Sequence, residues 1–459
     1  MKAFQRVLRA PSVREAMSHI PDVFYERFAT VVLLYWLAAP LLLWAIEQPT
    51  GISIGMLASI DLQVGVAALA LGALLMIDRL LGRGLTFDRS FLREQLPFLL
   101  LLAFIAWLVI ASLLHPTDAT WRGDGYRRES VFAYASYVGF FFLASRVFRR
   151  SLRRLIVGGV LALVTITCAV TLFTVGSGVV ASGVWSLPRG VSAYFENLNH
   201  YGYMLAVGGA IAACGALLAV RRPMRMLLLG VFGSILFTLL LNDTLGAYVA
   251  LALVGVGVIG WLVVLGRLFV RRALALITVA AVVHIAAVSG GVGILSELVS
   301  LGADAQAISS GEDADASGSG RWGLWVQTLD MIASSPWFGN GIESTADLLA
   351  GGYGRPHNEY LQYAAFFGVP ALTAYLGALI VVFRRVAQQG RAVDNITVYA
   401  AAAVATYLVS AFFGNTMYYT APLVFLLLGV VWSGVRTPRV ATALTPRQPL
   451  SVETAVPRP

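Results

Sequence analysis

The segment from Thr244 to Gly266, TLGAYVALALVGVGVIGWLVVLG, contains no charged residue. At about 1.5 Å per residue, an α-helix of this length measures about 35 Å, enough to cross about 30 Å of membrane hydrocarbon. Arg267, Arg271 and Arg272 follow it directly. Basic residues at the end of an apolar run are typical of a helix that leaves the membrane on its cytoplasmic side. The segment therefore predicts a membrane-spanning helix.

Similar apolar runs recur along most of the chain. The sequence is 58% hydrophobic and 12% charged, with a mean hydropathy of +0.77, whereas soluble domains are about 25% charged. We therefore expect an all-α polytopic membrane protein with about 12 transmembrane helices. The predicted spans lie near residues 28–46, 57–77, 96–114, 130–148, 155–175, 200–220, 224–242, 244–266, 273–295, 366–383, 396–414 and 417–435.

The basic residues alternate between the two sides of this predicted bundle. All but six of the 33 Lys and Arg residues lie at the N-terminus, in alternate connections or in the tail. By the positive-inside rule, both termini are cytoplasmic, so the net charge of +9 reflects topology and not nucleic-acid binding. The predicted organisation is a cytoplasmic segment (1–27), spans 1–9 (28–296), a large periplasmic loop (297–356), spans 10–12 (357–435) and a disordered cytoplasmic tail (436–459).

Six arginines fall on the outer side, where orientation gives no reason for them. A guanidinium binds phosphate oxygens through a planar fork of donors, so an outer cluster suits a diphosphate. Arg127 and Arg128 could instead pair with a nearby carboxylate such as Glu129. The six are Arg122, Arg127, Arg128, Arg189, Arg321 and Arg355.

The large outer loop contains a predicted helix from Arg321 to Ser334. Its apolar residues recur at helical spacing, which predicts an amphipathic helix along the bilayer surface that Pro336 terminates. We expect the outer tryptophans to be interfacial anchors and not sugar-stacking platforms. These are Trp185, Trp322, Trp325 and Trp337.

The loop ends in Arg355-Pro356-His357-Asn358-Glu359-Tyr360-Leu361-Gln362. Because proline favours the first helical position, His357 is expected in the first turn of a helix, with Glu359 on another face. The positive helix end would keep the imidazole neutral and able to accept a proton. The alternative is a polar cluster that only caps the helix.

One base with several arginines would suffice for glycosyl transfer from a diphosphate without a metal. A carboxylate pair at Asp313 and Asp315 could bind a metal, but its Gly/Ser/Ala-rich surroundings favour a solvated linker.

Several short motifs together resemble the bacterial O-antigen ligase and polymerase superfamily, and among its members the O-antigen ligases most. They are residues 357–362, Pro336 with Gly339 and Gly341, Ser319-Gly320-Arg321, and Arg189 ahead of Asn197-Leu198-Asn199. Two positions depart from the family pattern. Leu198 replaces a proline, and Leu245 stands where many members have an arginine that helps to hold the diphosphate.

The resemblance implies a glycosyltransferase C-like fold and a cofactor-free, metal-independent, inverting enzyme of the bacterial inner membrane with a periplasmic active site. Such an enzyme moves O-antigen from undecaprenyl diphosphate to lipid A–core oligosaccharide. It implies an essential base, His357, and essential arginines, Arg189 and Arg321. The expected substrate-positioning residues are Asn197, Asn199, Asn358, Tyr360 and Gln362.

An O-antigen polymerase or a protein O-oligosaccharyltransferase would share this chemistry. A lipid-linked glycan transporter is a further alternative, but it should carry ionisable residues near the membrane midplane, where the predicted spans have few.

Overall fold

The computed structural model describes residues 5, 22–50, 65–72, 89–123, 129–183, 186–193, 195, 197–293, 321–345, 349, 354–416 and 420–436. Within these residues the secondary structure is helical, without strands. The elements are α3 (Asp22–Thr50), α5 (Arg89–Leu114), α6 (Val131–Ser145), α7 (Arg150–Ser182), α8 (Leu198–Leu218), α9 (Arg222–Asn242), α10 (Leu245–Val264), α11 (Val270–Ser289), α13 (Arg321–Ser334), α15 (Glu359–Phe367), α16 (Val369–Gln389), η3 (Gly390–Ala392), α17 (Asn395–Ser410), η4 (Ala411–Phe413) and α18 (Ala421–Val435).

Eight of the described helices are long and apolar enough to cross a membrane. They are α5, α7, α8, α9, α10, α11, α16 and α17, and two shorter apolar helices, α6 and α18, accompany them. The protein is therefore a polytopic α-helical membrane protein, as the sequence predicted. The count of twelve spans stays a prediction, because most of the second predicted span lies outside the described residues.

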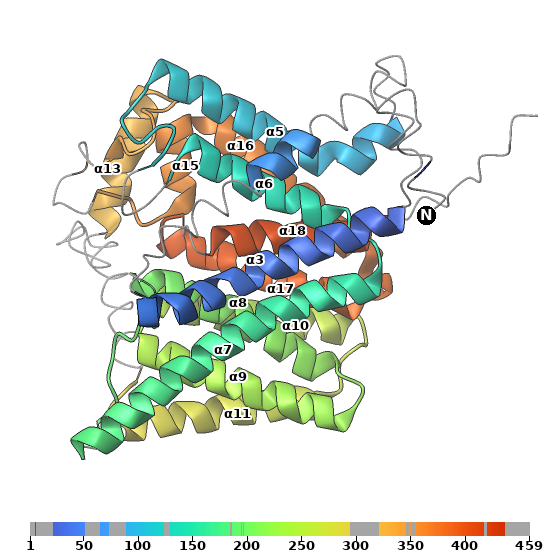
Figure 1. The fold of residues 1–459 in the computed structure, drawn as a ribbon, viewed down its shortest axis with the longest axis vertical. Helices are drawn as coiled ribbons and strands as arrows, with labels where there is room; N and C mark the ends of the chain where they lie inside the picture. Colours follow the sequence, from blue (N-terminus) through green and yellow to red (C-terminus); the bar gives the residue numbers. More distant parts are fainter. Residues whose placement is uncertain are drawn as a thin grey trace, which may run out of the picture.

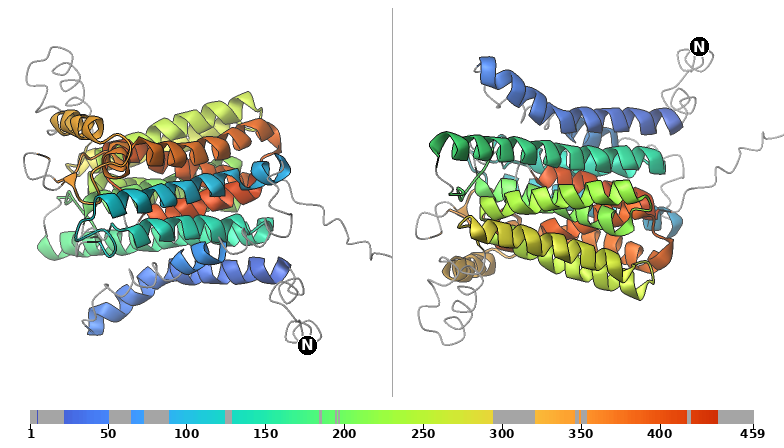
Figure 2. Two further views of the ribbon diagram at one scale, coloured as in Figure 1. Left: turned by 90° about the horizontal axis from the view of Figure 1, so that it is seen from above. Right: turned by 90° about the horizontal axis from the view of Figure 1, so that it is seen from below.

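The helices form a bundle with α8 in its interior (Figure 1). The apolar stretch of α8 is 100% buried, whereas those of α10 and α11 are only 22% and 17% buried. Apolar side chains such as Val256 and Ile285 are exposed on these two helices, as expected for surfaces that face lipid. On the opposite side, α3 is the outermost helix and packs against α7 (Figure 2).

Small residues allow the inner helices to approach closely. Gly429 of α18 lies against the backbone of α6 at Phe141, where a Cβ atom would collide with the carbonyl group. Gly208 of α8 similarly lies against the side chain of Val164 in α7. Small residues serve this purpose in membrane bundles because lipid supplies little hydrophobic drive for helix association.

The two ends of the bundle differ in charge. One end carries the arginines of the α6–α7, α8–α9, α10–α11 and α16–α17 connections. There Arg153 pairs with Asp394 at 2.9 Å, and although burial would raise the pKa of Asp394, the guanidinium holds it below its usual range. The opposite end carries α13 and α15 (Figure 1). Helix α13 has the predicted bounds and runs across the ends of the spans (Figure 1), as a helix along a membrane surface would.

Candidate active site

The turn that leads into α15 holds His357 in an unusual backbone conformation. Its φ is 50°, in the left-handed region that residues other than glycine seldom adopt. The backbone N–H of His357 donates to Asn415 Oδ1 at 3.0 Å, and the indole N–H of Trp325 donates to the carbonyl of Pro356 at 2.8 Å. Two neighbouring segments, α13 and the turn after η4, thus support this backbone. Strained conformations held by their surroundings are common at functional sites.

Helix α15 begins later than the sequence predicted. Asn358 is its N-cap, and Asn358 Oδ1 accepts hydrogen bonds from the backbone N–H groups of Tyr360 at 3.0 Å and Leu361 at 3.1 Å. The prediction that His357 lies in the first helical turn is wrong, because the asparagine side chain satisfies the first free N–H groups. His357 precedes the cap by one residue. Trp325 supports this turn, and its role as an interfacial anchor stays a prediction.

Glu359 is buried between two tyrosines. The Tyr407 hydroxyl donates to Glu359 Oε2 at 2.7 Å, and the Tyr375 hydroxyl donates to Oε1 at 3.2 Å. Burial raises the pKa of Glu359 to about 7; the two hydrogen bonds oppose this shift, and the charge of Glu129 adds to it. Near neutral pH the carboxyl group therefore exists in both protonation states, two residues from His357.

Arg355 is enclosed by acidic groups and does not face a substrate. Its side chain is 1% exposed, and its guanidinium pairs with Glu129 at 2.5 Å and with Glu343. The Glu129 carboxylate also accepts a hydrogen bond from Gln362 Nε2 at 2.7 Å. The predicted diphosphate-binding role of Arg355 is therefore replaced by a structural one, since an enclosed, neutralised cation cannot reach a ligand. The sequence-based alternative that paired Arg127 or Arg128 with a nearby carboxylate stays a prediction, because both arginines lie outside the described residues.

Arg321, the first residue of α13, lies on the same side of the bundle end as His357. Its guanidinium is close enough to Tyr203 of α8 to interact with it electrostatically. The Tyr203 ring lies directly against Gly414, where a Cβ atom would collide with the hydroxyl. The next residue, Asn415, accepts the hydrogen bond from His357. Arg321 lies one helical turn before Trp325, whose indole N–H supports the turn of His357.

Arg189 lies in a second polar group at this end. Its side chain is 44% exposed, donates to the carbonyl of Gly291 at 3.1 Å, and lies 3.9 Å from the Asp243 carboxylate. Asp243 terminates α9 in a left-handed conformation with φ of 62°. Helix α10 begins two residues later, and its Gly246 packs against Phe413, next to Gly414. Helix α10 and the turn after η4 therefore link the surroundings of Arg189 to those of His357.

The remaining predicted arginines divide into two groups. Arg122 is exposed in the turn after α5. Arg127 and Arg128 lie outside the described residues, as does the possible metal-binding pair Asp313 and Asp315. In the part of the chain that the structure describes, no three His, Cys, Asp or Glu side chains form a group that could hold a metal ion.

Most of the predicted substrate-positioning residues make contacts within the protein. Asn197 caps α8 and accepts a hydrogen bond from the backbone N–H of Asn199 at 2.8 Å. Tyr360 donates through its hydroxyl to the carbonyl of Leu408 at 2.6 Å. Asn358 caps α15, and Gln362 is buried against Glu129. These residues shape the backbone around the site.

Sequence reasoning missed Tyr203 and Asn415, and it considered Glu129 only as a partner for arginines close to it in the sequence. Each contacts a partner far away in the chain, so local spacing carried no signal for it. Glu359 was noted but set aside. The helix dipole alone favours an acidic residue in the first turn of a helix. The sequence therefore carried no sign that Glu359 is also buried against distant tyrosines.

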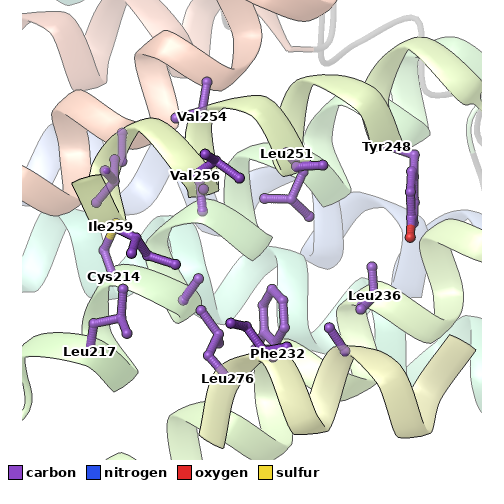
Figure 3. A pocket seen from close by; sticks show the side chains of 18 residues that line it. Cys214, Leu217, Phe232, Leu236, Tyr248, Leu251, Val254, Val256, Ile259 and Leu276 are labelled. Carbon is purple, nitrogen blue, oxygen red and sulfur yellow. The ribbon is translucent and has the colours of Figure 1, made fainter. Parts of the chain in front are cut away.

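An apolar groove lies between helices of the bundle. Its volume is about 230 Å³, and side chains of α8, α9, α10 and α11 face it, with Tyr248 at one edge (Figure 3). Tyr248 also lines a smaller cavity next to Asp243, the residue near Arg189. The groove opens on the lipid-facing surface of the bundle at Val256 and Ile277, which are 71% and 55% exposed. Tyr248 thus lies between this groove and the small cavity next to Asp243.

Comparison with known proteins gives one match. No curated protein sequence matches the chain. Residues 230–376 match the model of a family described as O-antigen ligase. The matched segment runs from within α9 to within α16 and includes Asp243, Arg321, Arg355, His357 and Glu359. This match supports a place for the chain in the O-antigen ligase/polymerase superfamily.

Proposed function

We propose that the protein is an O-antigen ligase. It transfers O-antigen polysaccharide from undecaprenyl diphosphate to lipid A–core oligosaccharide, with inversion at the transferred sugar and without a metal. The observation that carries this proposal is the turn of His357, which Asn415 and Trp325 hold in a left-handed conformation. Arg321 lies one turn before Trp325 on α13, and a fixed base with a guanidinium at the same bundle end suits an acceptor hydroxyl that attacks a sugar diphosphate.

The donor would bind through its diphosphate and its lipid. Arg189 is substantially exposed and Arg321 partly so, so both can present donors to phosphate oxygens. Charge accumulates on the diphosphate as it leaves, and positioned guanidinium groups stabilise that charge. The apolar groove of Figure 3 suits part of a polyprenyl chain, because it opens on the lipid-facing surface and Tyr248 at its edge also lines the small cavity next to Asp243. Arg122 and the neighbouring Arg127 and Arg128 are further candidates for the diphosphate.

In the proposed reaction, the imidazole of His357 accepts the proton of the acceptor hydroxyl. The acceptor oxygen forms a bond to the anomeric carbon while the bond from that carbon to the phosphate oxygen breaks. The leaving undecaprenyl diphosphate takes the electron pair, and the proton later passes to water. Attack from the side opposite the leaving group inverts the anomeric centre. Asn415 and Asn358 position His357 through the backbone.

The placement in the membrane follows from the charges. The end of the bundle with the α6–α7 and α8–α9 arginines would face the cytoplasm. The His357 end would then face the periplasm from the bacterial inner membrane, with both chain termini cytoplasmic. We propose a glycosyltransferase C-like bundle of about 12 spans for the complete chain.

The same site would also serve an O-antigen polymerase or a protein O-oligosaccharyltransferase. These differ from a ligase in the acceptor, so the products separate them. A deletion strain that accumulates free lipid A–core together with long undecaprenyl-linked chains indicates a ligase. Accumulation of single repeat units would indicate a polymerase, and loss of glycans from proteins would indicate an oligosaccharyltransferase.

The direct test uses purified full-length protein in lipid vesicles with undecaprenyl-diphosphate glycan and lipid A–core. We expect glycan-extended lipid A–core to form at the same rate with and without a chelator. Replacing Arg189 or Arg321 by Ala should lower this rate, whereas replacing the exposed Asp330 by Asn should not. Transport of the donor across the vesicle without a new glycosidic bond would contradict the proposal and support a transporter.

A further inference from the structure

A second cavity lies at the arginine-rich end of the bundle, opposite the His357 end. Its volume is about 610 Å³, within the range of about 300–1,000 Å³ that ligand sites usually have. It is formed by the first turns of α7 and α17, the end of α8 and the first turns of α9. The proposed glycosyl transfer makes no use of this cavity.

Three arginines surround the mouth of the cavity. Arg150 and Arg154 come from α7, and Arg221 precedes α9. Arg150, Arg154 and Arg221 line the cavity together with Tyr399, and the charges of Arg150 and Arg154 both act on Tyr399. The nearest carboxylate, Asp394, is 4.0 Å from Arg150 but 2.9 Å from Arg153, which neutralises it. The mouth therefore carries an excess of positive charge.

Below the arginines the cavity has apolar walls and opens on the side of the bundle. Val157, Leu161, Ile211 and Leu228 line them. A Cβ atom on Gly158 would meet nothing within 4 Å, so the groove is open above this residue. The positive-inside rule explains why arginines lie at this end of the bundle, but it does not require them to gather around an apolar groove.

We infer that this cavity binds an anionic phospholipid of the membrane leaflet at the arginine-rich end. The phosphate lies between Arg154 and Arg221, where guanidinium forks match its oxygens. One acyl chain follows the groove past Gly158. The excess of guanidinium over free carboxylate selects a net negative headgroup over a zwitterionic one. The lipid would pack between α7 and α9 and stabilise their arrangement.

The test is lipid binding to the full-length protein, measured by native mass spectrometry from detergent. The probes are phosphatidylglycerol, phosphatidylcholine with the same acyl chains, and inorganic phosphate. We expect one phosphatidylglycerol to bind at least tenfold more tightly than phosphatidylcholine. The double variant Arg154→Gln/Arg221→Gln should lose this preference. The matched control Arg222→Gln/Arg384→Gln removes two exposed arginines that do not line the cavity and should keep it.

The variant Gly158→Trp tests the groove without changing any charge. We expect it to weaken phosphatidylglycerol binding about tenfold while the unfolding temperature in lipid-free detergent stays that of the wild type. Unchanged phosphatidylglycerol binding by both Arg154→Gln/Arg221→Gln and Gly158→Trp would overturn the inference. Equal binding of the two phospholipids would also overturn it, as would displacement of the lipid by equimolar inorganic phosphate. None of these measurements depends on glycosyl transfer.

Discussion

The variant Glu359→Gln tests the buried carboxyl group beside His357. The pKa of Glu359 is raised from 4.5 to about 7, chiefly by burial. The folded protein thus binds this proton more tightly than the unfolded chain does. The contribution of Glu359 to the free energy of unfolding is therefore largest below pH 4.5 and falls as the pH rises through 7. Glutamine is neutral at every pH and should abolish this dependence.

The raised pKa of Glu359 corresponds to about 3 kcal/mol, at about 1.36 kcal/mol for each tenfold change in proton affinity. Most of this contribution is lost between pH 5 and pH 8. Glutamine has one carbonyl acceptor for the hydroxyls of Tyr375 and Tyr407, so the weaker hydrogen bonding costs about 1 kcal/mol. We therefore expect Glu359→Gln to match the wild type at pH 5 and to be about 2 kcal/mol more stable at pH 8.

The assay is equilibrium unfolding in mixed micelles at pH 5, 6, 7 and 8. The control is Asp330→Asn, which removes an exposed carboxylate and should change little at any pH. If the difference between Glu359→Gln and the wild type were the same at pH 5 and pH 8, the reasoning about burial would be refuted.

Three further substitutions test the site. Arg355→Met leaves the carboxylates of Glu129 and Glu343 without their cation and should cost about 3–5 kcal/mol of folding free energy, measured by the same unfolding assay; an unchanged transition would show that the pair is not buried. Asn358→Ala should cost about 1 kcal/mol through loss of the N-cap, and Asn358→Ser should restore most of it; equal losses for both would argue against capping. Arg321→Lys keeps the charge but loses the planar fork, so kcat/KM for the donor should fall at least tenfold, corresponding to about 1.4 kcal/mol; an unchanged kcat/KM would separate Arg321 from the diphosphate.

Local patterns predicted the helices well where one physical signal dominated. The apolar run after Thr244 is α10, and the spacing of aromatic and aliphatic residues ahead of Pro336 gave the bounds of α13. At residues 356–359 two start signals competed. Pro356 predicted an early helix start, but Asn358 can accept hydrogen bonds from the first free N–H groups, so the helix begins at Glu359. Weighing the asparagine more heavily would have placed His357 outside the helix.

The polar contacts of the site could not be predicted in the same way. Arg355 resembles a free outer arginine in the sequence, and only the folded bundle brings Glu129 of the α6 end to it. Glu359 similarly owes its raised pKa to burial among helices distant in the sequence, and the hydrogen bonds from Tyr375 and Tyr407, 16 and 48 residues away, oppose that shift. Such contacts depend on which helices pack together, and a single sequence of apolar spans does not specify that.

The central claim is that His357 acts as the base of glycosyl transfer, and single-turnover transfer by His357→Ala tests it most directly. The reaction uses purified full-length protein, undecaprenyl-diphosphate glycan and lipid A–core, with His115→Ala as the matched control at the same end of the bundle. We predict that His357→Ala lowers the rate at least a hundredfold, keeps the donor affinity and unfolds like the wild type, while His115→Ala transfers normally. A His357→Ala rate within a few-fold of the wild type would contradict the claim.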